Sequence, residues 1–524
     1  MAEFNVEENI KDLLSKDKWR KSVEIEGQSA YLSTWQSYYG GYQSSKFYTL
    51  NQNGKTFQCI KKSINMPKKV CENFSNFILN EKCDIIIPTS AKKNLDMKLK
   101  QSNFWVNANQ YYEKAMALSM CAVVQGLKKF EIDENGTFKA GSGEWKARWV
   151  DATKIYPITV KDNEIIECAF YSANTNTNDL ELHVLNEEGN YVIRSCSYDN
   201  ENGMIPNSYF ELDTMNNIKW FQIFSPNICN NLQKSKRLPI SILSNNLDIF
   251  DSLDEIYNDF YEEFNKGRKR IFVNAKLWRV NDLNGDIVKT FDNNDTTFYS
   301  VEFDDNTKPL IESSADPLRD QSYINGINNN LNILSSNLGL GKNFYNFNVS
   351  GESPKTATEV ISMTSDAIRT IKKHEILVKN ELINFVAACQ YISNTFTSDG
   401  LGEFNLNEIN VLFDDSIFED VNSEQTRDRT NVASGLMSEV EFRMRWFGED
   451  KKDAQKFINE NLRYKIINNY LSAWQTGALP TRLFITYCYP EYKEGTEEYN
   501  QLFNELEENK NKVVEPMIED TFIG

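Results

Sequence analysis

The sequence predicts an α+β protein, because helical periodicity and strand alternation occupy different stretches of the chain. Between 353 and 396, apolar side chains recur at steps of three, four or seven residues, and no glycine or proline interrupts the run after Pro354. Between about 124 and 203, side chains alternate and asparagine-rich turns separate short runs, as in antiparallel strands. The order of the strands in the sheet cannot be deduced from these patterns.

Composition and charge argue against a protein that grips nucleic acid. The chain has 524 residues, of which 40% are hydrophobic and 25% charged, as in an ordinary folded protein. This length accommodates about three or four compact units. The formal net charge of −18 would repel DNA phosphates. An acidic surface suits a conduit for DNA better than a clamp, although the same charge also serves plain solubility.

The sequence indicates a cytoplasmic protein without a metal or cofactor site. No apolar run approaches the length needed to cross a bilayer, and the charged N-terminal stretch lacks the apolar core of a signal peptide. The nine cysteines are scattered, their number is odd, and none forms a C-x-x-C pair. These features predict neither a disulfide framework nor a zinc site.

Several helices are expected ahead of the strand-rich stretch. An aromatic stripe within 31–39 has helical spacing and stops at Gly40 and Gly41. Such a stripe is more often core or interface than a ligand cage. Amphipathic patterns predict further helices at 1–18, 65–81 and 104–124.

A small β unit is expected between two helices in the middle of the chain. Residues 244–268 have one apolar face and end at Gly267, and 317–336 are again helical. Between them, short runs with Asn, Asp and Gly turns predict strands. A basic cluster follows the first helix and consists of Lys266, Arg268, Lys269 and Arg270. Such cations at a helix C-terminus complement the helix dipole, and contact with a polyanion is the functional alternative.

A glycine- and asparagine-rich loop is expected at 337–355. Gly341–Lys342 superficially matches a phosphate-binding loop. The match fails, because Ser336 stands where the first glycine is needed and Asn343 replaces the Ser or Thr. We therefore exclude a nucleotide site in this loop.

The helix that follows the loop has two plausible starts. Ser353 can cap it with Pro354 at the first helical position, or Thr356 can cap it with Glu359 three residues later as a capping box. About 40 residues of helix would span roughly 60 Å. One long helix in an ordinary bundle is the simplest interpretation.

The C-terminal part is expected to be helical after one short strand. The run EINVLFDD, which follows Gly402, predicts a strand, and helices begin at about Ser423. A faint repeat relates 434–450 to 476–492, with Gly435 matching Gly477 and a Phe in the middle of each copy. One pair of copies indicates a small helical hairpin array rather than a solenoid.

We find no catalytic constellation. His183 lies in an alternating strand pattern and His374 in the long helix, and both are expected to be structural. No metalloprotease, serine hydrolase or Walker motif occurs. The acidic pairs Asp414–Asp415 and Glu419–Asp420 are more typical of solvated turns than of a cation site. The sequence therefore predicts that the protein is not an enzyme.

Several stretches, in one order, resemble the portal proteins of tailed bacteriophages, in the branch common among phages of Gram-positive hosts. The most specific is TATEVISMTSDAIRTIKKHE (356–375), followed by IYNDFYEEFNKGRKRIFV (256–273) and ASGLMSEVEFRMRWFG (433–448). The shorter runs WQSYYG and ILNEK also match, and the resemblance covers roughly 30–465.

The resemblance implies a virion protein that forms a ring of about twelve subunits at one capsid vertex. Double-stranded DNA would pass through the ring without sequence recognition during packaging and ejection. The implied partners are the major capsid protein, the scaffold, the terminase large subunit and a head-completion adaptor, with assembly in the host cytoplasm and no membrane or cofactor. The alternatives are another ring-forming connector or tail component and an enzyme with an unrecognised site.

The resemblance also implies a division of the chain. The expected parts are a wing (1–243), a first stem helix (244–268), a β-rich clip (269–316), a second stem helix (317–336), a tunnel loop (337–355), a long helix with a returning wing strand (356–420), and a helical crown with a tail (421–524). The residues expected to serve the channel loop are Lys342, Asn343, Phe344, Tyr345 and Lys355. Thr356 and Glu359 are expected to cap the long helix.

Overall fold

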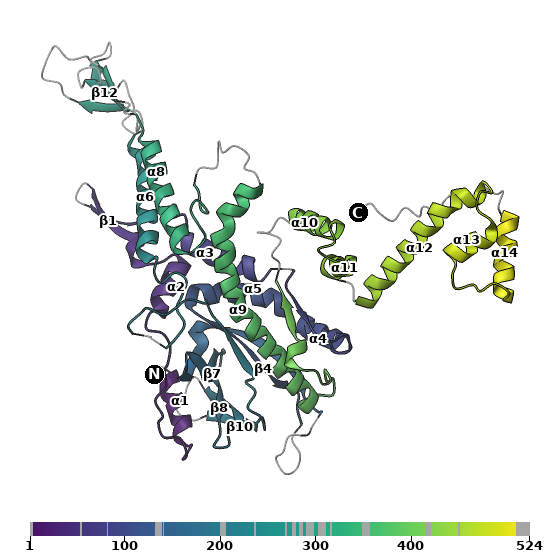
Figure 1. Cartoon of the computed structure of the whole chain (residues 1–524). Coiled ribbons are helices and arrows are strands. Elements are labelled where there is room, and N and C mark those ends of the chain that lie inside the picture. Colours follow the sequence, from purple (N-terminus) through teal and green to yellow (C-terminus); the bar gives the residue numbers. More distant parts are fainter. Residues whose placement is uncertain are drawn as a thin grey trace. The chain divides into compact units, whose positions relative to one another are not determined.

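The chain divides into two compact units, 1–418 and 419–524, which we describe separately. The computed structural model describes residues 4–52, 55–80, 82–131, 139, 141–199, 206–234, 237–267, 270–274, 279–281, 287–289, 298–301, 311–314, 317–347, 357–413, 421–448 and 451–509. Figure 1 shows helices and strands mixed through the first unit and only helices labelled in the second. The predicted α+β class is confirmed.

The first part of unit 1 is mainly helical, as predicted, but it also holds a hairpin. Its elements are α1 (Val6–Ser15), α2 (Leu32–Gly40), β1 (Phe47–Gln52), β2 (Lys55–Ile60), α3 (Met66–Ile78), β3 (Asp84–Ile86), α4 (Thr89–Gln101) and α5 (Phe104–Leu118). The helices expected at 1–18, 31–39 and 65–81 are confirmed as α1, α2 and α3. The β1–β2 hairpin, β3 and α4 were not predicted.

The predicted helix at 104–124 is wrong beyond Leu118. Ser119 adopts φ 84°, which ends α5, and β4 (Cys121–Lys128) follows. Short apolar runs fit a buried strand and a buried helix equally well, so periodicity alone misassigns them. Here the strand is favoured because β4 is the central strand of a buried three-stranded sheet.

The strand-rich stretch forms two antiparallel sheets. Its strands are β4, β5 (Glu144–Asp151), β6 (Ile155–Lys161), β7 (Glu164–Ala173), β8 (Thr177–Leu185), β9 (Tyr191–Asp199), β10 (Pro206–Asp213) and β11 (Phe221–Phe224). One sheet has the order β10-β9-β8-β7-β6, in which consecutive strands are neighbours, and the other has the order β11-β4-β5. The strands predicted between 124 and 203 are confirmed.

Helix α1 packs against the five-stranded sheet and is held there by buried ion pairs. Its Ile10 and Leu13 share a core with Leu182 of β8. Just after the helix, Arg20 forms two hydrogen bonds with the carboxylate of Glu167, at 2.9 and 2.6 Å. The charged groups therefore fix the N-terminal segment to the sheet that α1 covers.

The middle of unit 1 has the predicted helix–β–helix order. Its helices are α6 (Leu247–Lys266) and α8 (Asp320–Asn337), and the described strands between them are β12 (Arg270–Asn274), β13 (Arg279–Asn281), β14 (Ile287–Lys289), β15 (Phe298–Val301) and β16 (Ile311–Ser314). Helix α6 starts three residues later than predicted, because 241–246 form a hydrogen-bonded turn in which the N–H of Asn246 donates to the carbonyl of Leu243.

Helix α9 (Ala357–Phe396) crosses unit 1 and is part of its main core. Its 40 residues confirm the predicted long helix. Strand β17 (Asn410–Leu412) then pairs antiparallel with β3. The last predicted strand of this unit thus joins an N-terminal strand more than 300 residues earlier in the chain.

Two ionisable groups on α9 are shielded from water, and their pKa values move in opposite directions. Nδ1 of His374 accepts a hydrogen bond from the N–H of Asn227 at 3.0 Å, and burial lowers the pKa of His374 to about 4. The second group, Glu381, lies seven residues later on the same helix. Burial raises the pKa of Glu381 to about 7, despite the nearby Lys219. Each group is therefore mostly neutral near pH 6.

We expect the two groups to oppose each other in acid. A histidine with a lowered folded pKa contributes stability above its unfolded value of about 6.5, and loses roughly 3 kcal/mol of it as the pH falls to about 4. A glutamic acid with a raised folded pKa contributes stability at low pH and loses it as the pH rises through about 7.

The variant H374Q should thus lose less stability than wild type between pH 6.5 and 4.5, and E381Q should lose more. Urea unfolding at several pH values tests this, and parallel profiles for all three proteins would contradict it.

Unit 2 is helical in its described residues, and its turns bear on the predicted repeat. The helices are α10 (Val421–Ala433), α11 (Glu439–Phe447), α12 (Lys451–Gln475), α13 (Thr481–Cys488) and α14 (Glu497–Asn509). Gly435 and Gly477 follow α10 and α12 with φ of 74° and 76°, a conformation that favours glycine. The matched glycines therefore end matched helices, which supports the two-copy repeat.

Candidate functional site

The α6–α8 pair is fastened at both of its ends. The side chain of Asn337, at the end of α8, donates to Oδ1 of Asn246, just before α6, at 3.1 Å. At the opposite end, Arg319 precedes α8 and lies 2.7 Å from Glu263 near the end of α6. The two helices therefore run antiparallel, and Figure 1 shows them side by side. Each is about 30 Å long at 1.5 Å per residue.

The outward faces of the two helices differ in charge. Four exposed residues of α6 lie three or four positions apart and form one stripe, Asp248, Ser252, Glu255 and Asp259, which we call the acidic stripe. Helix α8 contains one charged residue, Asp320, and otherwise exposes mostly amides and hydroxyls. The α6–α8 pair thus presents an acidic surface along α6 and a nearly uncharged one along α8.

The β unit between these helices is built around β12. This strand pairs in parallel with β15 and antiparallel with β16. Arg270 is exposed at the start of β12, opposite Ser314 of β16. The remaining cations of the predicted basic cluster, which are Arg268, Lys269 and the side chain of Lys266, lie outside the described residues.

The described part of the predicted channel loop folds back along α8. Three backbone N–H groups of the loop donate to side chains of that helix. Asn343 donates to Oδ1 of Asn332 at 3.0 Å, and Phe347 donates to Oδ1 of Asn328 at 2.8 Å. Tyr345 donates to the hydroxyl of Ser335 at 3.1 Å. These acceptors on α8 hold the described part of the loop in place, although this part forms neither a helix nor a strand.

Two aromatic side chains of the loop, Phe344 and Tyr345, pack against the body of unit 1. Phe344 meets Phe77 of α3 edge to face at 5.9 Å, and Asn73 of α3 donates to the Tyr345 hydroxyl at 3.1 Å. Burial raises the pKa of Tyr345 above its usual range. Lys342 and Asn343 are exposed at the turn, where Asn343 adopts φ 62°. Of the predicted loop residues that are described, only these two face solvent.

The sequence of α8 contains a signal for this arrangement. Asn328, Asn332 and Ser335 lie at steps of four and three on α8, just ahead of a glycine-rich loop. Side chains of this type on one helical face can accept hydrogen bonds from the backbone of a returning chain. Lys355, Thr356 and the side chain of Glu359 lie outside the described residues, so both proposed starts of α9 stay untested.

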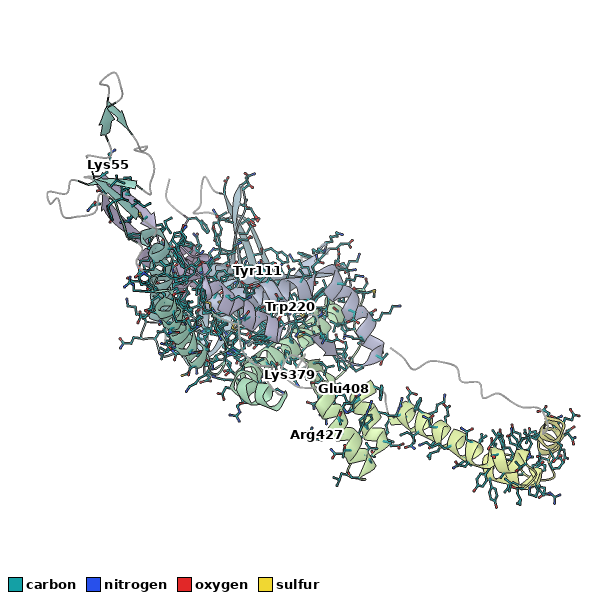
Figure 2. All side chains as sticks on the ribbon, turned by 90° about the horizontal axis from the view of Figure 1, so that it is seen from above. Lys55, Tyr111, Trp220, Lys379, Glu408 and Arg427 are labelled. Atoms are coloured by element: carbon teal, nitrogen blue, oxygen red, sulfur yellow. The ribbon has the colours of Figure 1, made fainter. Side chains whose placement is uncertain are left out.

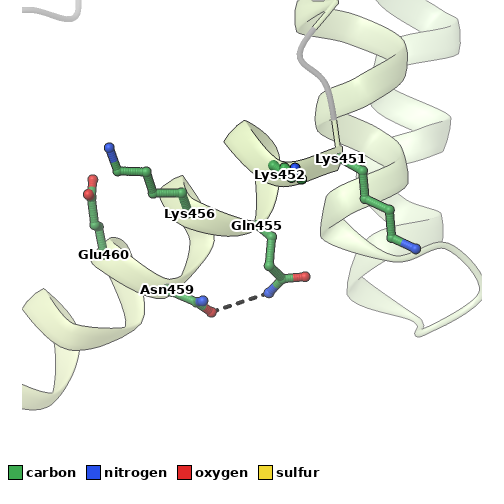
Figure 3. Close-up of a pocket in the computed structure, with 6 residues that line it drawn as sticks. All are labelled: Lys451, Lys452, Gln455, Lys456, Asn459 and Glu460. Carbon is green, nitrogen blue, oxygen red and sulfur yellow. Dashed lines mark hydrogen bonds between the residues drawn. The ribbon is translucent and has the colours of Figure 1, made fainter.

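Metal-binding clusters and membrane-spanning helices were sought among the described residues. The described residues contain no group of three His, Cys, Asp or Glu side chains placed to hold a metal ion. None of the helices among them has the length and apolar character that crossing a bilayer requires. Figure 3 shows a shallow depression at the start of α12, where Gln455 donates to Asn459 at 3.2 Å among exposed lysines. Its lining is exposed throughout, and it contains no built binding pocket.

A comparison with protein families gives a match over most of the chain. A family model described as "Phage portal protein, SPP1 Gp6-like" matches residues 24–465. This range includes the sheets, the α6–α8 pair, the loop, α9 and the first half of α12. Among curated proteins, no match was found.

Proposed function

Because this chain belongs to the SPP1 Gp6-like phage portal proteins, a structural rather than enzymatic family of the virion, we propose that about twelve copies form a ring at one capsid vertex. Double-stranded DNA enters the capsid through the ring during packaging and leaves through it during ejection. The terminase and, later, the head-completion adaptor dock on the ring. The family match over 24–465 supports this function.

The observation that carries the proposal is the α6–α8 pair with its β unit. Two antiparallel helices of about 30 Å give a wall element long enough to line a channel. The chain between them, which includes β12 and β16, gives the wall a small β end. In this proposal 244–268 and 317–336 are the stem, 269–316 is the clip that contacts terminase and adaptor, and 1–243 is the wing. The segment 356–420 supplies the long helix and a strand that returns to the wing, and 421–524 forms the crown and tail.

The loop 337–355 is the part that we assign to weak contact with DNA. Lys342 is the one charged residue among the described loop residues 337–347 and is exposed beside Asn343, and Phe344 and Tyr345 anchor this turn to α3. A single lysine neutralises about one phosphate, which slows DNA without holding it. Helix α8, whose one charged residue is Asp320, offers phosphate no cation along its described length.

We expect K342E to lower the amount of DNA retained in packaged particles by about twofold or more, since it exchanges attraction for repulsion at one position per subunit. Particle DNA content after nuclease treatment measures the effect. K161E is the matched control, because Lys161 is also exposed but lies at the end of β6. Equal DNA content in both variants and wild type would remove the loop from the DNA path.

Native mass measurement with negative-stain imaging of the purified protein tests the portal function as a whole. The expected result is a ring of about a dozen subunits with a central hole. If the purified chain is monomeric, the same test is repeated with capsid protein and scaffold co-expressed. A closed dimer in both conditions would overturn the proposal.

A further inference from the structure

One stretch of this acidic chain contains no carboxylate at all. The whole chain has 75 Asp and Glu residues, about one in seven, yet none occurs between 27 and 71. The same stretch has six lysines, which are Lys46, Lys55, Lys61, Lys62, Lys68 and Lys69. It contains the β1–β2 hairpin. The hairpin therefore belongs to a local positive segment on a negative protein.

The hairpin lacks the cover that a two-stranded sheet needs. Among the described strands, β1 and β2 pair only with each other, so the outer edge of each is open. Phe47 pairs with Ile60 across the hairpin, and these side chains are 49% and 64% exposed. Phe57 is 47% exposed. An isolated hairpin is marginally stable in water, and apolar cross-strand pairs stabilise it only when something covers them.

The base of the hairpin is nevertheless firmly attached to α6. Nζ of Lys46 lies 3.6 Å from the carboxylate of Asp254, and both side chains are buried. Gln43 donates to the same carboxylate at 3.2 Å. The N–H of Lys62 donates to Asn258 at 3.1 Å. The hairpin is therefore fixed at its base, and Figure 2 labels Lys55 on it.

Most of the lysines of the hairpin are already engaged within the chain. Lys46 pairs with Asp254, Lys61 lies 3.9 Å from Glu255, and Lys62 lies over the ring of Tyr261 at 5.2 Å. Lys55, beside the hairpin turn, is exposed. One lysine contributes little to holding DNA, whereas exposed Phe and Ile side chains gain nothing from phosphate. The hairpin is therefore better suited to a protein surface than to DNA.

We propose that the β1–β2 hairpin of one copy packs against the stem of the next copy in the ring, with Lys55 facing the acidic stripe of that neighbour's α6. This inference rests on the proposed ring. The stripe carries Asp248 and Asp259, and also Glu255 beside Lys61 of its own copy, so its exposed carboxylates complement Lys55. Contact with the neighbour covers Phe47 and Ile60, which the copy's own α6 leaves exposed. The partner is a second copy of this chain, because the same fixed arm and the same stripe recur at every position of a ring.

The apolar contact is tested with I60S. Ile60 and Val106 have the same exposure, 64%, so V106S on α5 is a matched control. We expect I60S to need about tenfold more protein for half-maximal ring assembly, and V106S to assemble as wild type. The midpoint temperature of thermal unfolding of the monomer should be the same for I60S and V106S. If I60S assembles as readily as V106S, the interface is wrong, although the portal function can still stand.

The charge contact is tested by exchange. K55E and D259K should each weaken ring assembly, and the double variant should recover most of the loss, because the attraction is restored with its sign reversed. Single variants that assemble normally, or a double variant as weak as the sum of the singles, would overturn the pairing.

Rings that form normally but lose packaged DNA would assign the hairpin to DNA instead. A wild-type chain that forms no ring with capsid protein and scaffold present would overturn the proposed function itself.

Discussion

The variant F385A is expected to lower the free energy of unfolding of unit 1 by about 3–5 kcal/mol. Phe385 lies on α9 and is completely buried, with its ring 4.7 Å from that of Phe104 on α5. Trp145 of β5 meets it at 6.2 Å. Truncation removes contacts that α9 makes with a helix and with the three-stranded sheet at once, and leaves a cavity behind. Urea unfolding, followed by intrinsic tryptophan fluorescence, measures the loss.

The matched control for this variant is F264A. Phe264 is 45% exposed near the end of α6 and has a ring neighbour in Phe260 at 5.0 Å. Its truncation should cost less than about 1 kcal/mol. Equal losses for F385A and F264A would show that α9 does not organise the core of unit 1.

The variant R20A is expected to lower the free energy of unfolding by a similar amount, about 3–5 kcal/mol, because it leaves a buried carboxylate without its partner. The Arg20 and Glu167 side chains are 9% and 5% exposed. Although burial works against the charged form, hydrogen bonds from Arg20 and Thr159 lower the pKa of Glu167. Chemical denaturation of R20A beside wild type at pH 7 provides the measurement.

Two comparisons separate this effect from a general loss of charge. R237A is the control, since Arg237 is 69% exposed and 3.9 Å from Glu26, and it should cost less than about 1 kcal/mol. Adding E167Q to R20A should restore part of the loss. The lowered pKa of Glu167 also means that the contribution of the pair is present above about pH 4.3 and is lost as the pH falls below it. An R20A loss no larger than that of R237A would contradict the buried pair.

The helices that serve the candidate site were predictable because their signals are local. Three signals are each contained in one stretch of sequence: the apolar face of 244–268, the uninterrupted run ahead of Phe396, and the turn residues between α6 and α8. Periodicity of this kind reports which face of an element will be buried, whatever covers it. The signal for the hairpin at 47–60 is equally local, because Asn53–Gly54, a common hairpin-turn pair, separates its two strands in the sequence.

The roles of individual side chains depend on partners that are distant in the sequence. Phe344 and Tyr345 were expected at the channel, and their packing against α3 involves residues about 270 positions earlier. The end of α5 and the start of β4 likewise depend on the neighbouring strands of the sheet.

The sequence by itself determined the α+β class, the helix–β–helix order and the family. Only the tertiary structure decided which loop residues face solvent, which ion pairs are buried and which hairpin stays uncovered. The reason is that a side chain's periodic position specifies the face on which it lies, whereas its burial depends on the element that packs there.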